Sequence, residues 1–173
     1  MNVMAEINYV KNPELKIILP GWKGNPVING RFIDPIKRFN NSFSNVLRWQ
    51  LSRNDKKEAK KNDKWRLTVH EGNSFLKREG NFIVWLGHAS YFMQLNGTRL
   101  ITDPVFGRIS GIVPRFSNLP CLPVDFADID YVLLSHAHRD HCDEPSLKAL
   151  AANNNFTLLT SLNTGKLVAD SLP

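Results

Sequence analysis

Residues 133–141 read LLSHAHRDH and contain three of the five histidines in this 173-residue chain. They continue from DYVLL, residues 130–134, a short apolar run that is typical of a buried strand. They precede DEPSLKAL, residues 143–150, where acidic residues and Pro145 predict the first turn of a helix. The histidines therefore lie where a strand ends and a helix begins, which is a common place for functional groups in α/β proteins.

The spacing of the polar side chains in this stretch predicts a metal site. Residues two apart point to the same side of an extended chain, so His136 and His138 can bind one metal ion together. Asp140 and His141 are adjacent where the backbone turns toward the helix, and they can reach a second point nearby. Neutral imidazole and carboxylate suit zinc, and also iron or manganese. A solvated loop that happens to be rich in histidine is the alternative, and the pattern favours the metal site.

Three segments resemble a known family. Residues 136–141 match the HxHxDH signature of the metallo-β-lactamase superfamily. VWLGHAS, residues 84–90, and LITDPVF, residues 100–106, resemble segments of the branch that holds N-acylphosphatidylethanolamine phospholipase D and the bacterial ascorbate-phosphate lactonases. Residues 115–130 are more similar to the phospholipase D side. The resemblance covers about residues 64–160 with specific motifs, and the stretch before them more loosely.

This resemblance implies a fold and further site residues. The implied fold is α/β (α+β): the N-terminal half of an αββα sandwich, with a mixed β-sheet and flanking helices, after an irregular or helical arm. His88 is placed close to the metal ions, where it lines the site or donates a hydrogen bond to a ligand. Asp103, at a strand end, would accept an imidazole N–H and orient a ligand. The alternative for Asp103 is a turn that begins before Pro104.

The resemblance also implies a function. In its complete form the protein would be a hydrolase with one or two zinc ions, or iron or manganese in their place, and a metal-bound hydroxide would attack the substrate. We expect Asp140 and His141 to act in catalysis as well as in metal binding. A phosphodiester of the N-acylphosphatidylethanolamine type is the leading expected substrate, and a lactone is the runner-up.

No histidine follows His141, although the resemblance implies two further histidines and a bridging aspartate from a C-terminal half. We therefore expect the chain to supply only the first half of the sandwich and to leave one apolar sheet face uncovered, which favours association. The alternative to a hydrolase is a truncated, catalytically silent half-domain. It would need a C-terminal half or a partner chain, such as a second copy.

The amino-acid composition and net charge indicate which classes of partner the chain can bind. Hydrophobic residues make up 42% and charged residues 22% of the chain, as in ordinary globular proteins. The net charge of +6 favours anionic partners, such as a small-molecule or phospholipid-like substrate, with peripheral membrane contact left open. We expect no nucleic-acid partner because no aromatic and basic stacking platform is evident. Two cysteines, no secretory signal and no apolar run of about 18 residues predict a cytoplasmic protein, with a peripheral position at the inner membrane surface as the alternative.

The N-terminal part, residues 1–62, is predicted to hold an arm and an amphipathic helix. Prolines and glycines before residue 40 argue against long elements, and Trp22 and Phe32 are expected to anchor the arm. Residues 42–61 predict one helix with Asn41 or Ser42 as its N-cap. Its apolar stripe is expected to be core, with contact to anionic lipid as the alternative: Phe43, Val46, Leu47 and Leu51.

Residues 63–173 are predicted to form the first αβ half of the sandwich. Strands are expected at residues 65–70, 81–86 and 156–160, the second of them covered on both faces. Residues 91–102 predict a hairpin, because Asn-Gly at 96–97 supplies a tight turn. The connection 104–127 is either a lid or a loop folded over the sheet edge, and residues 165–172 begin a further helix.

Overall fold

The computed structural model describes residues 6–33, 42–52, 54–65 and 67–172, and the chain forms two compact units, residues 1–65 and 66–173. The ends of the predicted arm, residues 1–5 and 34–41, lie outside the described residues, and so does the alternative N-cap Asn41. Within the described residues, no helix combines the length and the hydropathy that crossing a bilayer requires.

The N-terminal unit contains a small antiparallel sheet where the sequence predicts an irregular arm. Its strands pair in the order β1-β2-β3. Asn29 and Gly30, with φ of 50° and 75°, form the tight turn between the last two strands. Trp22 is 38% exposed and Phe32 is 47% exposed, and their anchoring of the arm on the main body stays a prediction. The strands are β1 (Asn8–Val10), β2 (Asn25–Ile28) and β3 (Arg31–Phe32).

The single helix predicted over residues 42–61 is two helices, α1 (Phe43–Leu51) and α2 (Lys57–Asn62). Ser52 ends α1 because it adopts an extended conformation, and its hydroxyl donates to the carbonyl of Trp49 at 2.6 Å. Ser42 is the N-cap, without a capping hydrogen bond from its side chain. Within its own unit α1 buries no residue and Phe43 is 81% exposed, so the burial of the apolar stripe in a core stays a prediction.

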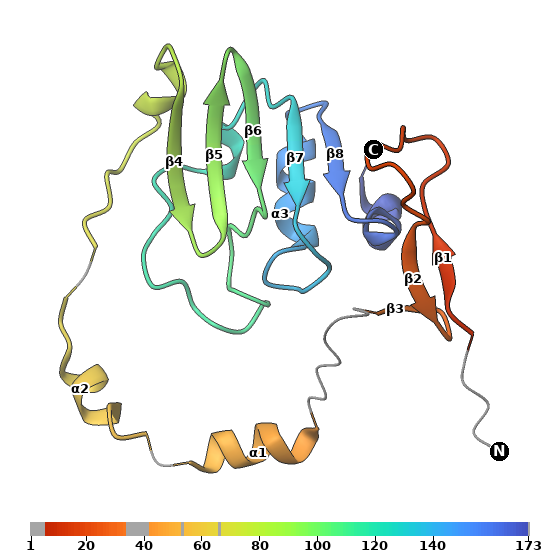
Figure 1. The fold of residues 1–173 in the computed structure, drawn as a ribbon. Coiled ribbons are helices and arrows are strands. Elements are labelled where there is room, and N and C mark those ends of the chain that lie inside the picture. Colours follow the sequence, from red (N-terminus) through yellow and green to blue (C-terminus); the bar gives the residue numbers. More distant parts are fainter. Residues whose placement is uncertain (1–5, 34–41, 53, 66, 173) are drawn as a thin grey trace. The chain divides into compact units, whose positions relative to one another are not determined.

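A five-stranded mixed sheet dominates the second unit (Figure 1). The strand order is β4-β5-β6-β7-β8, in which the first three strands are antiparallel and the last three are parallel. Helix α3 (Glu144–Ala151) connects β7 to β8, and the predicted hairpin is confirmed, with φ of 51° at Asn96 and 84° at Gly97. The strands are β4 (Phe82–Gly87), β5 (Ser90–Leu95), β6 (Thr98–Thr102), β7 (Tyr131–Leu134) and β8 (Thr157–Thr160).

Two predicted elements of this unit differ from the structure. Residues 67–70 do not form a strand, because they make no ladder with a neighbour; they line an apolar groove of about 350 Å³ beside β4 instead. Residues 164–171 form two short 3₁₀ turns in place of a helix, η3 (Thr164–Leu167) and η4 (Ala169–Ser171). Two further 3₁₀ turns lie earlier in the chain, η1 (Ser74–Lys77) and η2 (Pro123–Asp125).

The hydrophobic core lies between one face of the sheet and α3. Phe92 and Val132 contribute from the strands and Leu147 from the helix, all fully buried. Both ends of the long connection after β6 enter this core, where Phe106 stacks on Phe126 with ring centroids 5.7 Å apart. The connection therefore supports the same face of the sheet that α3 covers, while Ile112, Val113 and Phe116 in its middle are exposed.

The opposite face of the sheet is open in the part of the chain that the structure describes. Strand β4, predicted to be covered on both faces, alternates between buried and exposed residues, with Trp85 47% exposed. In register with it, Tyr91 and Leu159 stand on the same face across the sheet. The exposed apolar side chains of this face are Ile83, Trp85, Tyr91, Leu95, Tyr131 and Leu159.

Ser146 ties the start of α3 to the core, and its loss should destabilise the unit. Its hydroxyl accepts the backbone N–H of Phe106 at 2.8 Å and donates to the carboxylate of the N-cap Asp143 at 2.5 Å. Ser146→Ala should lower the free energy of unfolding by about 1–3 kcal/mol, because the buried N–H loses its acceptor. Urea unfolding measures this, with the exposed Ser74→Ala as the control. Equal stability of the two variants would contradict the assignment.

Candidate metal centre

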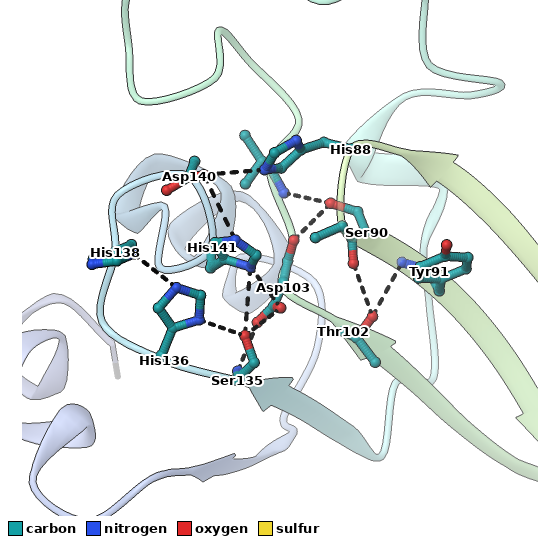
Figure 2. A network of polar contacts seen from close by, with 12 residues as sticks. His88, Ser90, Tyr91, Thr102, Asp103, Ser135, His136, His138, Asp140 and His141 are labelled. Atoms are coloured by element: carbon teal, nitrogen blue, oxygen red, sulfur yellow. Dashed lines mark hydrogen bonds and ion pairs between the residues drawn. The ribbon is translucent and has the colours of Figure 1, made fainter. Parts of the chain in front are cut away.

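One edge of the five-stranded sheet collects the polar side chains predicted from the sequence (Figure 2). Strands β4, β6 and β7 run in the same direction, so their carboxyl ends meet at this edge. His88 lies in the turn after β4, Asp103 directly follows β6, and residues 136–141 form the loop after β7. Three segments that are distant in sequence therefore meet at one place.

Three of these side chains form a cluster that could hold a cation. One ligand atom from each of His88, Asp140 and His141 lies within 4.8 Å of the other two. The carboxylate Oδ2 of Asp140 is 3.4 Å from Nε2 of His88 and 3.6 Å from Nε2 of His141. Two imidazoles and a carboxylate are a donor set that suits zinc, iron or manganese, so the residues present fit such an ion.

The carboxylate of Asp103 lies behind the cluster and is 5% exposed. It accepts the backbone N–H of Ser135 at 2.7 Å and the hydroxyl of Ser135 at 2.6 Å. Its Oδ2 is 2.9 Å from Nδ1 of His141. Because a carboxylate accepts hydrogen bonds, this contact favours the His141 tautomer with its proton on Nδ1. The other ring nitrogen, Nε2, is then free to bind a cation beside Asp140.

The structure places His136 and His138 next to each other and beside His141, outside the three-residue cluster. Nε2 of His136 is 2.9 Å from Nδ1 of His138, and Nδ1 of His136 is 2.9 Å from the Ser135 hydroxyl. The ring centroids of His136 and His141 are 4.1 Å apart. All four loop residues predicted as ligands are thus close together, and the roles of His136 and His138 as ligands stay a prediction.

Two features of the site were missed in the sequence. The resemblance predicts His88 near the metal ions and not as a ligand, yet in the structure its Nε2 lies as close to Asp140 as that of His141 does. Ser135 was not singled out, although it contacts Asp103 and two histidines. Two sequence features could have indicated these roles. They are the glycine-histidine pair at the end of a strand, residues 87–88, and the small hydroxyl residue Ser135 just before the first histidine of the loop.

The pKa values of two groups in the loop, Asp140 and Cys142, are shifted in opposite directions. Desolvation pushes the pKa of Asp140 upward, but the hydrogen bond from its own backbone and the nearby His141 and His88 outweigh this effect and hold the pKa below its ordinary value. The carboxylate is therefore available as a ligand. Desolvation, together with Asp103, Asp143 and Glu144, raises the pKa of Cys142, which disfavours its thiolate. Both cysteines are free thiols.

Comparison with known proteins identifies relatives of this part of the chain. Residues 82–170 match the model of the β-lactamase superfamily domain. N-acyl-phosphatidylethanolamine-hydrolyzing phospholipase D 1 of Caenorhabditis elegans is 30% identical over 145 residues, which cover 75% of this chain and 40% of that protein. A UPF0173 metal-dependent hydrolase of Caldivirga maquilingensis is 30% identical over 63 residues, which cover 36% of this chain and 24% of that protein.

A solved structure, the isothiocyanate hydrolase from Delia radicum gut bacteria, superposes with a TM-score of 0.41 at 21% identity. The superposition covers 51% of this chain and 38% of the other. The chain thus spans 40% or less of the length of each of these three proteins.

The contact between Asp103 and His141 predicts the protonation of a single ring nitrogen. Nitrogen-15 NMR of the histidine side chains should show His141 with its proton on Nδ1. Asp103→Ala should shift His141 toward the Nε2-protonated tautomer, which predominates for a free imidazole. Ser74→Ala, remote from the loop, should leave the spectrum unchanged. A His141 with its proton on Nε2 in the wild-type chain would contradict the contact.

Proposed function

The chain belongs to the metallo-β-lactamase superfamily, and from this membership we propose that it is the metal-binding part of a metal-dependent hydrolase. The observation that carries the proposal is the cluster of His88, Asp140 and His141 at the edge of the sheet. It lies in the HxHxDH loop and the preceding glycine-histidine turn, which are two of the three segments whose motifs resemble the superfamily. A relative whose name describes it as a metal-dependent hydrolase supports the same reading.

We propose one or two zinc ions as the resident metal, held by Asp140 and His141 together with His88, His136 and His138. Iron and manganese are the alternatives, because imidazole and carboxylate bind all three. A bound ion supplies a Lewis acid that polarises the substrate and activates water at neutral pH. Asp103 keeps the His141 ring oriented through its contact with Nδ1. Asp140 adds negative charge within 3.6 Å of both neighbouring imidazoles and would orient the attacking nucleophile.

The substrate class we propose is a phosphodiester that carries an acyl chain, of the N-acylphosphatidylethanolamine type. Support comes from the Caenorhabditis elegans relative, whose name describes this hydrolysis. The net charge of +6 favours an anionic substrate and is compatible with peripheral contact to an anionic membrane surface.

A second candidate is a half-domain that is silent alone and acts only after a completing C-terminal half or partner chain has covered the sheet. The open apolar face around Trp85, Tyr91 and Leu159 favours this candidate. Apolar side chains on adjacent strands that lack a cover are a common basis for protein association.

Metal content and turnover separate the candidates. The wild-type chain should bind zinc, as measured by equilibrium dialysis and mass spectrometry of the metal, and Asp140→Asn should weaken binding at least tenfold because the site loses an anionic ligand. His70→Ala is the matched control, since His70 is an exposed histidine outside the cluster. Hydrolysis of N-acylphosphatidylethanolamine and of a simple lactone is then measured with saturating zinc.

Each outcome has one meaning. Zinc binding with phosphodiester turnover supports the hydrolase with the proposed substrate, and lactone turnover alone would replace the substrate class. Zinc binding with no turnover on either substrate supports the silent half-domain. Absence of zinc binding, or equal binding by Asp140→Asn and wild type, would contradict the proposed metal centre.

A further inference from the structure

A half-buried arginine, Arg115, lies in the long connection after β6 and contacts the backbone near His88 and Asp103. The guanidinium of Arg115 donates to the backbone carbonyls of Leu86 and Val105, the latter at 2.5 Å, and its Nε donates to the carbonyl of Ser117 at 3.4 Å. Burial lowers the pKa of Arg115 from its usual value. Among the ion pairs of the described residues none involves Arg115, so backbone carbonyls are the partners that the structure gives this cation.

Two of these carbonyls belong to the segments that carry site residues. Leu86 is two residues before His88, and Val105 is two residues after Asp103. Both are buried in the core, with Leu86 1% exposed and Val105 fully buried. One guanidinium thus connects the turn that presents a cluster histidine to the turn that presents the carboxylate behind the cluster. The planar fork of arginine donors suits two carbonyls held at a fixed separation.

Both turns have backbone conformations that need support. His88 and Asp103 have φ of 50° and 38°, in the left-handed region that residues with a side chain seldom adopt. The ladder between β4 and β5 shifts register between Trp85 and Gly87, close to the carbonyl that Arg115 binds. The indole of Trp85 donates to the carbonyl of His88 at 2.9 Å from the other side of the same turn.

Gly87 lies next to the guanidinium of Arg115 and leaves space for it. It has φ of 97°, which favours glycine, and a Cβ added to it would overlap Nη2 of Arg115. The glycine of the WLGH segment therefore has two functions: it permits the turn and it leaves room for the guanidinium.

We propose that Arg115 is a positioning residue of the metal centre, which fixes the His88 turn relative to the Asp103 turn by donating to the carbonyls of Leu86 and Val105. The inference rests on the proposed metal centre, to which Arg115 contributes no ligand. Without the guanidinium, the two turns remain joined by the hydroxyl of Ser90, which donates to the carbonyl of Asp103 and accepts the N–H of Val105. His88 is then held less firmly at its distance of 3.4 Å from Asp140. Groups that orient ligands from outside the coordination sphere typically change metal affinity by roughly ten- to a hundredfold.

Cobalt(II) titration of the full chain tests this proposal, because the visible spectrum of bound cobalt reports the coordination geometry. Arg115→Met should weaken cobalt binding roughly ten- to a hundredfold and change the spectrum. Arg115→Lys should recover part of the affinity, since an ammonium can reach one carbonyl but cannot span both. Arg108→Met is the matched control, because Arg108 is exposed in the same connection and donates to the carbonyl of Ile112. It should behave as wild type.

A second measurement, which needs no bound metal, tests the role of Arg115 if a variant does not fold or if the chain does not bind cobalt. Side-chain NMR of His88 in the metal-free chain should shift in Arg115→Lys and in Gly87→Ala, and it should not shift in Arg108→Met. If wild type bound no cobalt, the proposed function would fail, while the His88 resonances would still decide the role of Arg115. Wild-type affinity and spectrum in folded Arg115→Met, or an unchanged His88 resonance in Arg115→Lys, would overturn the proposal.

Discussion

The site depends on the carboxylate of Asp103, which joins the end of β6 to the loop after β7. Parallel pairing of these strands brings Thr102 opposite Leu133, and the N–H of Asp103 donates to the carbonyl of Leu133 at 2.8 Å. The side chain can then accept two hydrogen bonds from Ser135 and contact His141. A residue of another length or charge at this position would leave a backbone N–H, a hydroxyl and an imidazole without their shared acceptor. The contacts of Asp103 with Ser135 and His141 therefore position the loop after β7.

The parts of the fold that could be predicted are those encoded by neighbouring residues. Asn96-Gly97 determines the hairpin, and Asp143 and Pro145 mark the start of α3, because turn and cap geometry depend on a few consecutive residues. The strand predicted at residues 65–70 depends on a contact distant in sequence. Whether residues 67–70 become a strand is decided by a ladder with a neighbouring strand such as β4, and the alternating sequence pattern does not report that ladder.

For the site too, the sequence indicates what depends on neighbouring residues and does not indicate contacts between distant segments. The spacing of the histidines indicates a metal loop, but the approach of His88 to Asp140 depends on β4, β6 and β7 running in the same direction. That direction follows from an antiparallel hairpin joined to a parallel crossover.

The role of Arg115 cannot be recognised from a sequence pattern, because its partners are backbone carbonyls, which every residue has. The open apolar face of the sheet lies opposite the face that α3 covers, so covering it would not disturb the core that supports the site.

The central claim is that the carboxyl ends of three strands build one metal centre around Asp140 and His141. Anomalous diffraction at the zinc edge, from crystals of the chain grown with zinc, tests it most directly. The account predicts a zinc peak bound by Nε2 of His141 at about 2.0–2.1 Å and by the carboxylate of Asp140, with Asp103 still in contact with Nδ1. Zinc found only elsewhere on the surface, or bound to His141 through Nδ1, would contradict it.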